Sequence, residues 1–486
     1  MGKITFYGGI NEIGGNKILL DDGGTKILLD FGVSFRRYGE FFAEFVQPRK
    51  CNGIGDFLET GLLPDVKGLY REDYLKRAGR IESLDFQGLL LSHAHADHSS
   101  FIHHLRADLP IYCSKATYAI LKALNDTAST PFGELTELVV AFETYVNRDG
   151  EISRKRRDSN PEIVVPRKFS LFDFQKKFRI DNFEIVPYEV DHSLPGTTGY
   201  IIHSPSGTIV YTGDLRFTGR RKEKSDEFLA ACAKEKPDLL LIEGTRVTET
   251  ASKSEEDVEA AVSKISSESQ ALTVCNWPIR DVDRMTSFLN AAKNIGKKLT
   301  VSLKQAYLLD CLNAQQVENV PRLSDDALRL YAMRKSWGLI GERPTQRLVN
   351  QDYDKWEQNY LPEAICHKEV GADQSKYLFF ASNFDLKELI DLKPSEGSAY
   401  IKSVCEPYDD EMRFDWKRTE NWINHFKLKL HRAHVSGHAS GPQLKEFVEK
   451  AQPKLVVPIH TEHPECYANW FKNVQLIKSN GTSITL

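Results

Sequence analysis

Three histidines and one aspartate lie within six residues of this sequence, in the segment Ser-His-Ala-His-Ala-Asp-His. They are His93, His95, Asp97 and His98. Neutral imidazole and carboxylate groups are the ligand types of Zn²⁺ and Mn²⁺. Side chains two positions apart in extended or turn backbone point the same way, so His93 and His95 can share one metal ion. Asp97 and His98, at the turn into a predicted helix, can face a second ion.

Three further ligand-type residues occur far from this cluster. His192, Asp214 and His460 each stand at the end of an apolar run that predicts a strand. The carboxyl ends of strands are where α/β proteins gather their chemical groups. Taken singly, each of the three is more often a capping or structural residue. Together with the first cluster, they predict a site for two metal ions.

The spacing of these residues predicts an inserted domain. Asp214 and His460 are 246 residues apart, which is too far for two ligands supplied by one compact layer. From about residue 246 the pattern changes to alternating helices and strands, as in a βαβ unit, and residues 322–397 are predicted to be mostly helical. The predicted domains are 1–245, an insertion of 246–428, and 429–486, which completes the first domain. Residues 36–82 and 115–180 carry no recognisable motif.

The H-x-H-x-D-H motif and the three strand-end ligands resemble the metallo-β-lactamase fold. Within that fold the sequence is most similar to the β-CASP nucleases, and to ribonuclease J in particular. Asp30, Glu243 in Leu-Ile-Glu-Gly-Thr and His438 in Val-Ser-Gly-His-Ala carry this resemblance. It implies an α/β fold, namely a metallo-β-lactamase αββα sandwich with an inserted α/β β-CASP domain.

The same resemblance implies two bound Zn²⁺ ions, with Mn²⁺ as the alternative. The ligands would be His93, His95 and His192 for one ion, Asp97, His98 and His460 for the other, and Asp214 as the bridge. Two such ions lower the pKa of a shared water toward ~7 and clamp a phosphodiester for in-line attack by a bridging hydroxide. We therefore expect a metal-dependent ribonuclease that hydrolyses single-stranded RNA as an exo- or endonuclease.

The remaining site residues are also implied by the resemblance. Asp97, His438 and Glu243 would be catalytic, with His438 stabilising the developing charge or protonating the leaving oxygen and Glu243 orienting it. Substrate would be bound at the small-residue turn Ser436, Gly437, His438 and Ala439, whose backbone N–H groups could hold a phosphate.

A polyanionic partner must be bound by local charge, because the whole chain has a net charge of −4. Basic residues predicted to supply phosphate affinity are Arg216, Arg220, Arg221, Lys222, Arg246, Arg280 and Arg284. Trp277 or Tyr307 could stack on a base, although a core position is favoured for both. The charged region 150–182 is expected to be a solvated insertion, with nucleic-acid contact as the less favoured interpretation.

The sequence lacks an apolar run of the ~18 residues that span a bilayer, and its N-terminus is not that of a secretion signal. We therefore expect a cytoplasmic protein without a membrane partner; a homodimer is left open. The chain ends 26 residues after His460, so the C-terminal domain of ribonuclease J is expected to be absent. Three alternatives remain: a DNA-directed β-CASP nuclease, a small-molecule thioester or lactone hydrolase, and a non-enzymatic RNA-binding module.

Overall fold

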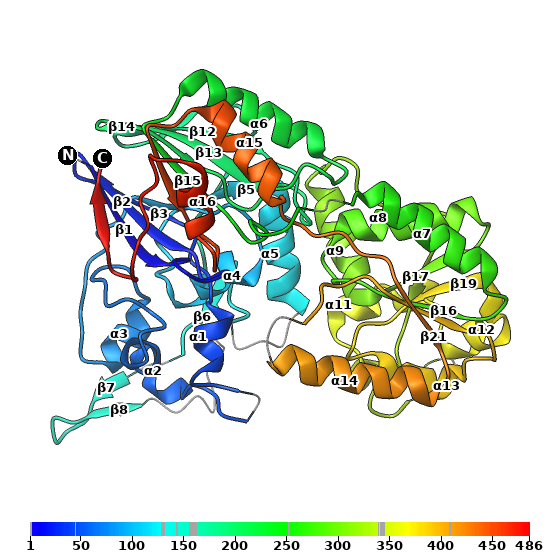
Figure 1. Ribbon diagram of the computed structural model, residues 1–486. Helices are drawn as coiled ribbons and strands as arrows, with labels where there is room; N and C mark the ends of the chain where they lie inside the picture. Colours follow the sequence, from blue (N-terminus) through cyan, green and yellow to red (C-terminus); the bar gives the residue numbers. More distant parts are fainter. Residues whose placement is uncertain are drawn as a thin grey trace.

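Two β-sheets packed face to face and a third sheet beside them make up the molecule (Figure 1). The computed structural model describes residues 2–43, 45–127, 132–141, 144–154, 163–250, 253–338, 340, 346–407 and 410–486. Within these residues, every helix is too short or too polar to cross a membrane. The first and last strands of the chain pair with each other, so both ends of the chain belong to the same domain.

The first sheet is buried on both faces. In its strand β2, Ile18 and Leu20 belong to the core between the two sheets, whereas Leu19 belongs to the core beneath the covering helices. This follows from the two-residue period of a strand. In spatial order the strands are β10 (Phe169–Phe172), β5 (Ile111–Ser114), β4 (Gly88–Leu90), β3 (Thr25–Leu29), β2 (Lys17–Asp22), β1 (Lys3–Gly8) and β23 (Ser483–Thr485). The helices on this side are α1 (Phe35–Gly39), α2 (Gly55–Glu59), α3 (Glu72–Arg77), α4 (Ala96–Ser99) and α5 (Lys115–Thr127), with 3₁₀ turns at Lys50–Asn52 and Ser100–His104.

The second sheet repeats this pattern. Tyr200 and Ile202 face the first sheet, and Ile201 between them packs under the outer helices. Its strands, in spatial order, are β11 (Phe178–Ile180), β12 (Phe183–Glu189), β13 (Thr198–Ser204), β14 (Gly207–Tyr211), β15 (Leu239–Ile242) and β22 (Leu455–Pro458). The outer helices are α6 (Lys222–Glu235), α15 (Gly441–Ala451) and α16 (Glu465–Trp470). The predicted order of layers, α, β, β and α, is confirmed.

The inserted α/β domain is confirmed as well. Its six strands are all parallel and have helices on both faces, as alternating strands and helices require. In spatial order they are β18 (Leu328–Tyr331), β17 (Lys298–Ser302), β19 (Tyr377–Phe380), β16 (Thr273–Asn276), β20 (Ala399–Lys402) and β21 (Lys429–Arg432). The helices are α7 (Glu255–Glu268), α8 (Val282–Asn294), α9 (Leu303–Ala314), α10 (Gln346–Asp352), α11 (Lys355–Gln358), α12 (His367–Ala372), α13 (Leu389–Leu392) and α14 (Asp410–His425), with 3₁₀ turns at Leu361–Glu363, Gln374–Lys376 and Leu386–Glu388. The last strand of the third sheet, β21, ends at Arg432. The domain boundaries at 245 and 428 stay predictions.

Two regional predictions differ from the structure. Most of the regular structure in residues 322–397 is helical, as predicted, but the prediction missed two strands there, β18 and the central strand β19. The run Tyr-Leu-Phe-Phe of β19 is fully buried, and periodicity cannot separate so short a buried strand from a helix.

The charged region 150–182 is not simply a solvated insertion. It contributes β10 to the edge of the first sheet and β11 to the second, and the strands β6 (Glu137–Val139) and β9 (Val164–Pro166) form a small sheet. The pair β7 (Thr144–Val146) and β8 (Ile152–Arg154) forms another. The predicted basic positions 155–157 lie outside the described residues.

Candidate metal centre

The seven predicted ligands come from the carboxyl ends of strands in both sheets of the first domain. Strands β12, β14 and β22 run in the same direction, so their carboxyl ends meet at one edge. The ligands follow in this way: His93 and His95 after β4, Asp97 and His98 on α4, His192 after β12, Asp214 after β14 and His460 after β22. The structure brings all seven together into two groups that could each hold a metal ion.

The first group consists of His93, His95, His192 and Asp214. The Nδ1 atom of His95 lies 2.9 Å from His93 Nε2 and 3.1 Å from His192 Nε2. Two nitrogens bound to one tetrahedral Zn²⁺ at ~2.0–2.1 Å lie roughly 3.3 Å apart. The three imidazoles therefore already have close to the spacing of ligands on one ion.

Asp214 connects this group with the second one, Asp97, His98 and His460. Its Oδ2 atom lies 3.6 Å from His93 Nε2, 3.2 Å from His98 Nε2 and 3.8 Å from His460 Nε2. His460 Nε2 is also 3.2 Å from Asp97 Oδ2. One carboxylate oxygen thus faces both groups, which is the position of a bridging ligand.

The chemistry of the donors fits two divalent cations. His98 Nε2 and Asp214 Oδ1 are buried and have no hydrogen-bond partner among the described residues. Burial lowers the pKa of His95 to about 3 and the pKa of His93 and His192 well below the usual value, so all three rings are neutral. Burial opposes ionisation of Asp214, but His460 and His98 hold its pKa well below the usual value. Neutral imidazole and ionised carboxylate are the forms that bind metal ions. His98 differs: burial opposes its protonation, but Asp214, Asp97 and Asp30 raise its pKa well above the usual value, so binding of a metal ion would displace a proton from this ring.

Second-layer partners fix the orientation of three ligand rings. Buried Asp30 lies 2.6 Å from His98 Nδ1. His460 Nδ1 is 2.9 Å from Thr245 Oγ1, and the carbonyl of Gly437 lies 2.5 Å from His192 Nδ1. Such partners set ring orientation and metal affinity. Sequence analysis missed these roles of Thr245 and Gly437, because neither residue type marks a ligand partner.

His438 and Glu243 form a pair beside the ligands. His438 Nδ1 lies 3.0 Å from both carboxylate oxygens of Glu243 and 4.0 Å from Asp214 Oδ2. Glu243 is fully buried and also accepts hydrogen bonds from the backbone N–H groups of Leu215 and Thr245. Burial opposes protonation of His438, but Glu243 and Asp214 raise its pKa to about 9. Glu243 thus favours the protonated imidazole and holds it in one orientation.

The turn at 436–439 does not present all of its backbone N–H groups to a phosphate, as we predicted that it would. The N–H of Ala439 donates to the carbonyl of Leu215 at 2.7 Å, and the N–H of His438 donates to Ser436 Oγ at 3.2 Å. Both donors are used within the protein, since the chain here must pack back against the segment after Asp214. Two of the predicted backbone donors are thus not available to a ligand.

The predicted phosphate-binding role of three arginines is wrong. Arg216 and Arg284 are fully buried, Arg221 is 5% exposed, and each lies in an ion pair within the protein. A guanidinium surrounded by carboxylates in the interior cannot reach a substrate. Trp277 is in the core, as favoured, stacked on Phe288.

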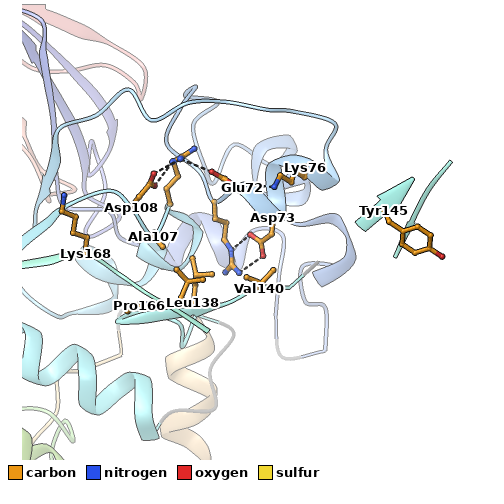
Figure 2. Close-up of a pocket in the computed structure, with 13 residues that line it drawn as sticks. Glu72, Asp73, Lys76, Ala107, Asp108, Leu138, Val140, Tyr145, Pro166 and Lys168 are labelled. Carbon is orange, nitrogen blue, oxygen red and sulfur yellow. Dashed lines mark hydrogen bonds and ion pairs between the residues drawn. The ribbon is translucent and has the colours of Figure 1, made fainter. Parts of the chain in front are cut away.

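A cavity of about 1040 Å³ lies apart from the ligand cluster, between α3 and the small sheets of the 130–170 region (Figure 2). None of the seven ligands lines it. Its buried charges are satisfied internally: Arg71 pairs with Asp73, and Arg106 pairs with Asp108 (Figure 2). The cavity therefore offers no catalytic groups comparable to those of the metal centre.

Comparison with known sequences gives two domain matches. Residues 65–274 match the β-lactamase superfamily domain, and residues 425–475 match the Zn-dependent metallo-hydrolase RNA specificity domain. Both matches confirm the resemblance predicted from the motifs.

Ribonuclease J proteins are among the similar sequences. That of Pyrococcus abyssi is 22% identical over 95% of this chain and 90% of its own length. That of Mycoplasma genitalium is 22% identical over 98% of this chain and 69% of its own length. The match to the Mycolicibacterium smegmatis protein covers 61% of this chain and 44% of that protein. A solved structure of an Enterococcus faecalis protein of unknown function has a TM-score of 0.71 at 22% identity over the full length of both chains, which shows the shared fold.

Proposed function

We propose that this chain, a metallo-hydrolase with a β-lactamase superfamily domain and an RNA specificity domain, hydrolyses phosphodiester bonds of single-stranded RNA. Its relatives over most of its length are named ribonuclease J. The observation that carries the proposal is the position of Asp214 Oδ2 between two groups of metal-ligand atoms. Paired metal sites are a recurrent arrangement for phosphodiester cleavage.

The proposed cofactors are two Zn²⁺ ions, because imidazole nitrogen dominates the donor set, and Mn²⁺ is the alternative. When bound, the two ions supply Lewis acidity to the phosphodiester and to the water that attacks it. His93, His95 and His192 would hold one ion. Asp97, His98 and His460 would hold the other, with Asp214 between them.

His438 is the proposed proton donor. Its Nδ1 atom faces Glu243, which leaves Nε2 as the ring atom available to the substrate. As the oxygen of the attacking water, which loses one proton, bonds to phosphorus and the bond to the leaving oxygen breaks, Nε2 gives its proton to the leaving oxygen. The proton lost by the water, released to solvent, accounts for the one that later restores the imidazolium. Glu243 keeps the imidazole protonated until that moment and holds the ring in place, a positioning role.

The test uses labelled single-stranded RNA and DNA of one sequence, with Zn²⁺ or Mn²⁺ supplied. We expect the wild-type chain and the surface control Asp173→Ala to cleave RNA, and Asp97→Ala to be inactive. Equal cleavage by Asp97→Ala would contradict a metal-dependent nuclease.

The same assay separates the other function classes. Cleavage of DNA alone would assign a DNA-directed nuclease. Turnover of a thioester or lactone without cleavage of either nucleic acid would assign a small-molecule hydrolase. RNA binding without any cleavage by the metal-loaded chain would assign a binding module.

A further inference from the structure

One arginine of the inserted domain reaches the metal centre of the first domain. Arg280 lies between the end of β16 and the start of α8 and is half-buried. Its Nη1 atom donates a hydrogen bond to the carbonyl of Ala94 at 3.3 Å. Ala94 stands between the ligands His93 and His95, so the guanidinium borders the ligand cluster.

Arg280 differs from the buried arginines nearby, because no carboxylate neutralises it. Arg216 and Arg284 each have a carboxylate oxygen of Glu255 within 3.2 Å. Among the described residues, Arg280 forms no ion pair, and the Ala94 carbonyl is the one acceptor of its guanidinium. A guanidinium carries five N–H donors, and burying its charge without a partner is costly. Most of its donors therefore remain available to a ligand.

A purely structural role for Arg280 would be that of a counter-charge for Asp97, whose negative charge acts on the guanidinium. Two observations argue against this role. The Oδ2 atom of Asp97 already lies 3.2 Å from His460 Nε2, and Arg280 is not within ion-pair distance of either oxygen. Two divalent cations would also outweigh the negative charges of Asp30, Asp97 and Asp214, while Glu243 is paired with His438. The loaded site with Arg280 beside it then has a surplus of positive charge, which an anionic ligand balances.

We propose that Arg280 binds the anionic oxygens of the substrate phosphate at the metal centre and thereby selects a charged phosphodiester over a neutral ester. The planar fork of a guanidinium matches two phosphate oxygens, and a lysine cannot reproduce that geometry. The inference rests on the proposed function and names the residue that sets its substrate class. It also gives the inserted domain a direct part in the site, because the ligands all belong to the first domain.

The probe is inorganic phosphate, measured by calorimetry on the metal-loaded full chain. We expect Arg280→Met to weaken phosphate binding about ten- to a hundredfold, the size of one hydrogen bond between charged groups. Arg280→Lys keeps the charge without the fork, so we expect an intermediate loss. The matched control is Arg334→Met, which removes an exposed arginine of the inserted domain that pairs with Asp391, and we expect wild-type binding.

Elemental analysis of each variant accompanies the binding measurement. Wild-type phosphate affinity in Arg280→Met with full metal content would overturn the proposal. Loss of metal from Arg280→Met and Arg280→Lys would also overturn it, because it would assign Arg280 a structural role.

A second readout tests selectivity directly. For bis(4-nitrophenyl) phosphate, we expect Arg280→Met to lower kcat/KM at least tenfold, and for the neutral 4-nitrophenyl acetate we expect no loss. Equal losses on both substrates would contradict a role in charge selection. Neither readout uses RNA, so failure of RNA cleavage with an intact Arg280 effect would reject only the proposed nuclease. RNA cleavage with no Arg280 effect would reject only this inference.

Discussion

Two clusters of buried titratable side chains lie within a few residues of each other in the sequence, and they differ in how completely their charges are paired. The metal centre contains His192 and Asp214, while Asp191 and Arg216 belong to a second cluster, which we call the junction network. The junction network consists of Arg216, Arg221 and Arg284 with Asp191, Glu255 and Asp283. Glu189 also lies 3.9 Å from Arg221, so three guanidinium groups meet four acidic groups.

In the junction network every charge has an opposite partner. Arg216 lies 3.3 Å from Asp191, 3.2 Å from Glu255 and 3.1 Å from Asp283. In the metal centre, by contrast, His98 Nε2 and Asp214 Oδ1 have no hydrogen-bond partner among the described residues. Arg221 Nη2 in the junction network also lacks a partner, but Nη1 of the same guanidinium pairs with Asp283, so the charge is balanced. Buried polar groups are normally satisfied, so two open ligand-type atoms in one cluster mark the metal centre as the one that awaits a ligand.

The junction network has a structural role. Glu255 begins α7, and Asp283 and Arg284 lie on α8, so the network joins the inserted domain to the strand ends that carry the ligands. Arg216 Nη1 also donates to the carbonyl of Ser436, next to the Gly437 carbonyl that faces His192. The junction network and the metal centre, only a few residues apart in the sequence, thus differ in how completely their buried charges are paired.

The largest expected effect comes from removing the ligand that faces both metal groups. Asp214→Ala should lose bound metal and lower nuclease activity more than about 100-fold. Replacing a residue that only supports a metal ligand costs about 10–100-fold, and removing the ligand itself should cost more. Elemental analysis and the RNA assay measure both quantities. The control is Asp226→Ala, an exposed position on α6. Full metal content in Asp214→Ala would show that its oxygen does not bridge the two groups.

A smaller effect is expected from the pair beside the ligands. His438→Asn should lower turnover about 10²–10⁴-fold, the usual contribution of a general acid, without changing metal content. The exposed His463→Asn serves as the control. Because His438, Glu243 and Asp214 also lie close enough to hold an ion, loss of metal from His438→Asn would instead assign His438 to the ligand set.

The junction network should respond in stability and not in metal binding. Glu255→Gln removes the carboxylate that pairs with Arg284 and one of the three that pair with Arg216. The buried charge of Arg284 is then unbalanced, which costs about 3–5 kcal/mol in the free energy of unfolding. Glu256→Gln, an exposed neighbour on the same helix, should change it by less than about 0.5 kcal/mol. Urea unfolding measures both. A cost below about 1 kcal/mol for Glu255→Gln would mean that the junction tolerates unpaired charge.

The ligands of the metal centre could be predicted because their evidence is local. H-x-H-x-D-H places four of them within six residues, and the other three follow apolar runs that do form β12, β14 and β22. Strands that end at one edge then bring them together. The alternation of helices and strands from about residue 246 could be predicted for the same reason, since the apolar face of α8 repeats with helical spacing.

The junction network could not be predicted, because residue type does not reveal a partner that is distant in sequence. Arg216 and Arg284 have the composition of a phosphate-binding patch, and only the fold shows that Glu255 lies between them. The same holds for Thr245 and Gly437, whose contacts with ligand rings depend on tertiary packing. Arg280, which the sequence grouped with the others, is distinguished only by having no ion-pair partner in the part of the chain that the structure describes.

The smallest expected effect is a pH dependence at the edge of the junction network. His434 Nδ1 lies 3.1 Å from Arg284 Nη1, and burial together with that guanidinium lowers the pKa of His434 to about 4 from the usual 6.5. As pH falls from 6.5 to 4, the unfolded chain takes up a proton that the folded chain does not, so stability falls through this window and is unaffected above it. Urea unfolding of His434→Asn should therefore give a flatter stability curve between pH 6.5 and 4.5, whereas the exposed control His425→Asn should follow the wild type.

Glu255 does not confound this window, because its pKa is held at about 2 by Arg284 and Arg216 against the effect of burial, and its contribution is lost only below about pH 4.5. If stability falls with pH in His434→Asn as steeply as in the wild type, a protonated His434 must be tolerated beside Arg284. The charges of the junction network would then be less tightly balanced than the distances imply.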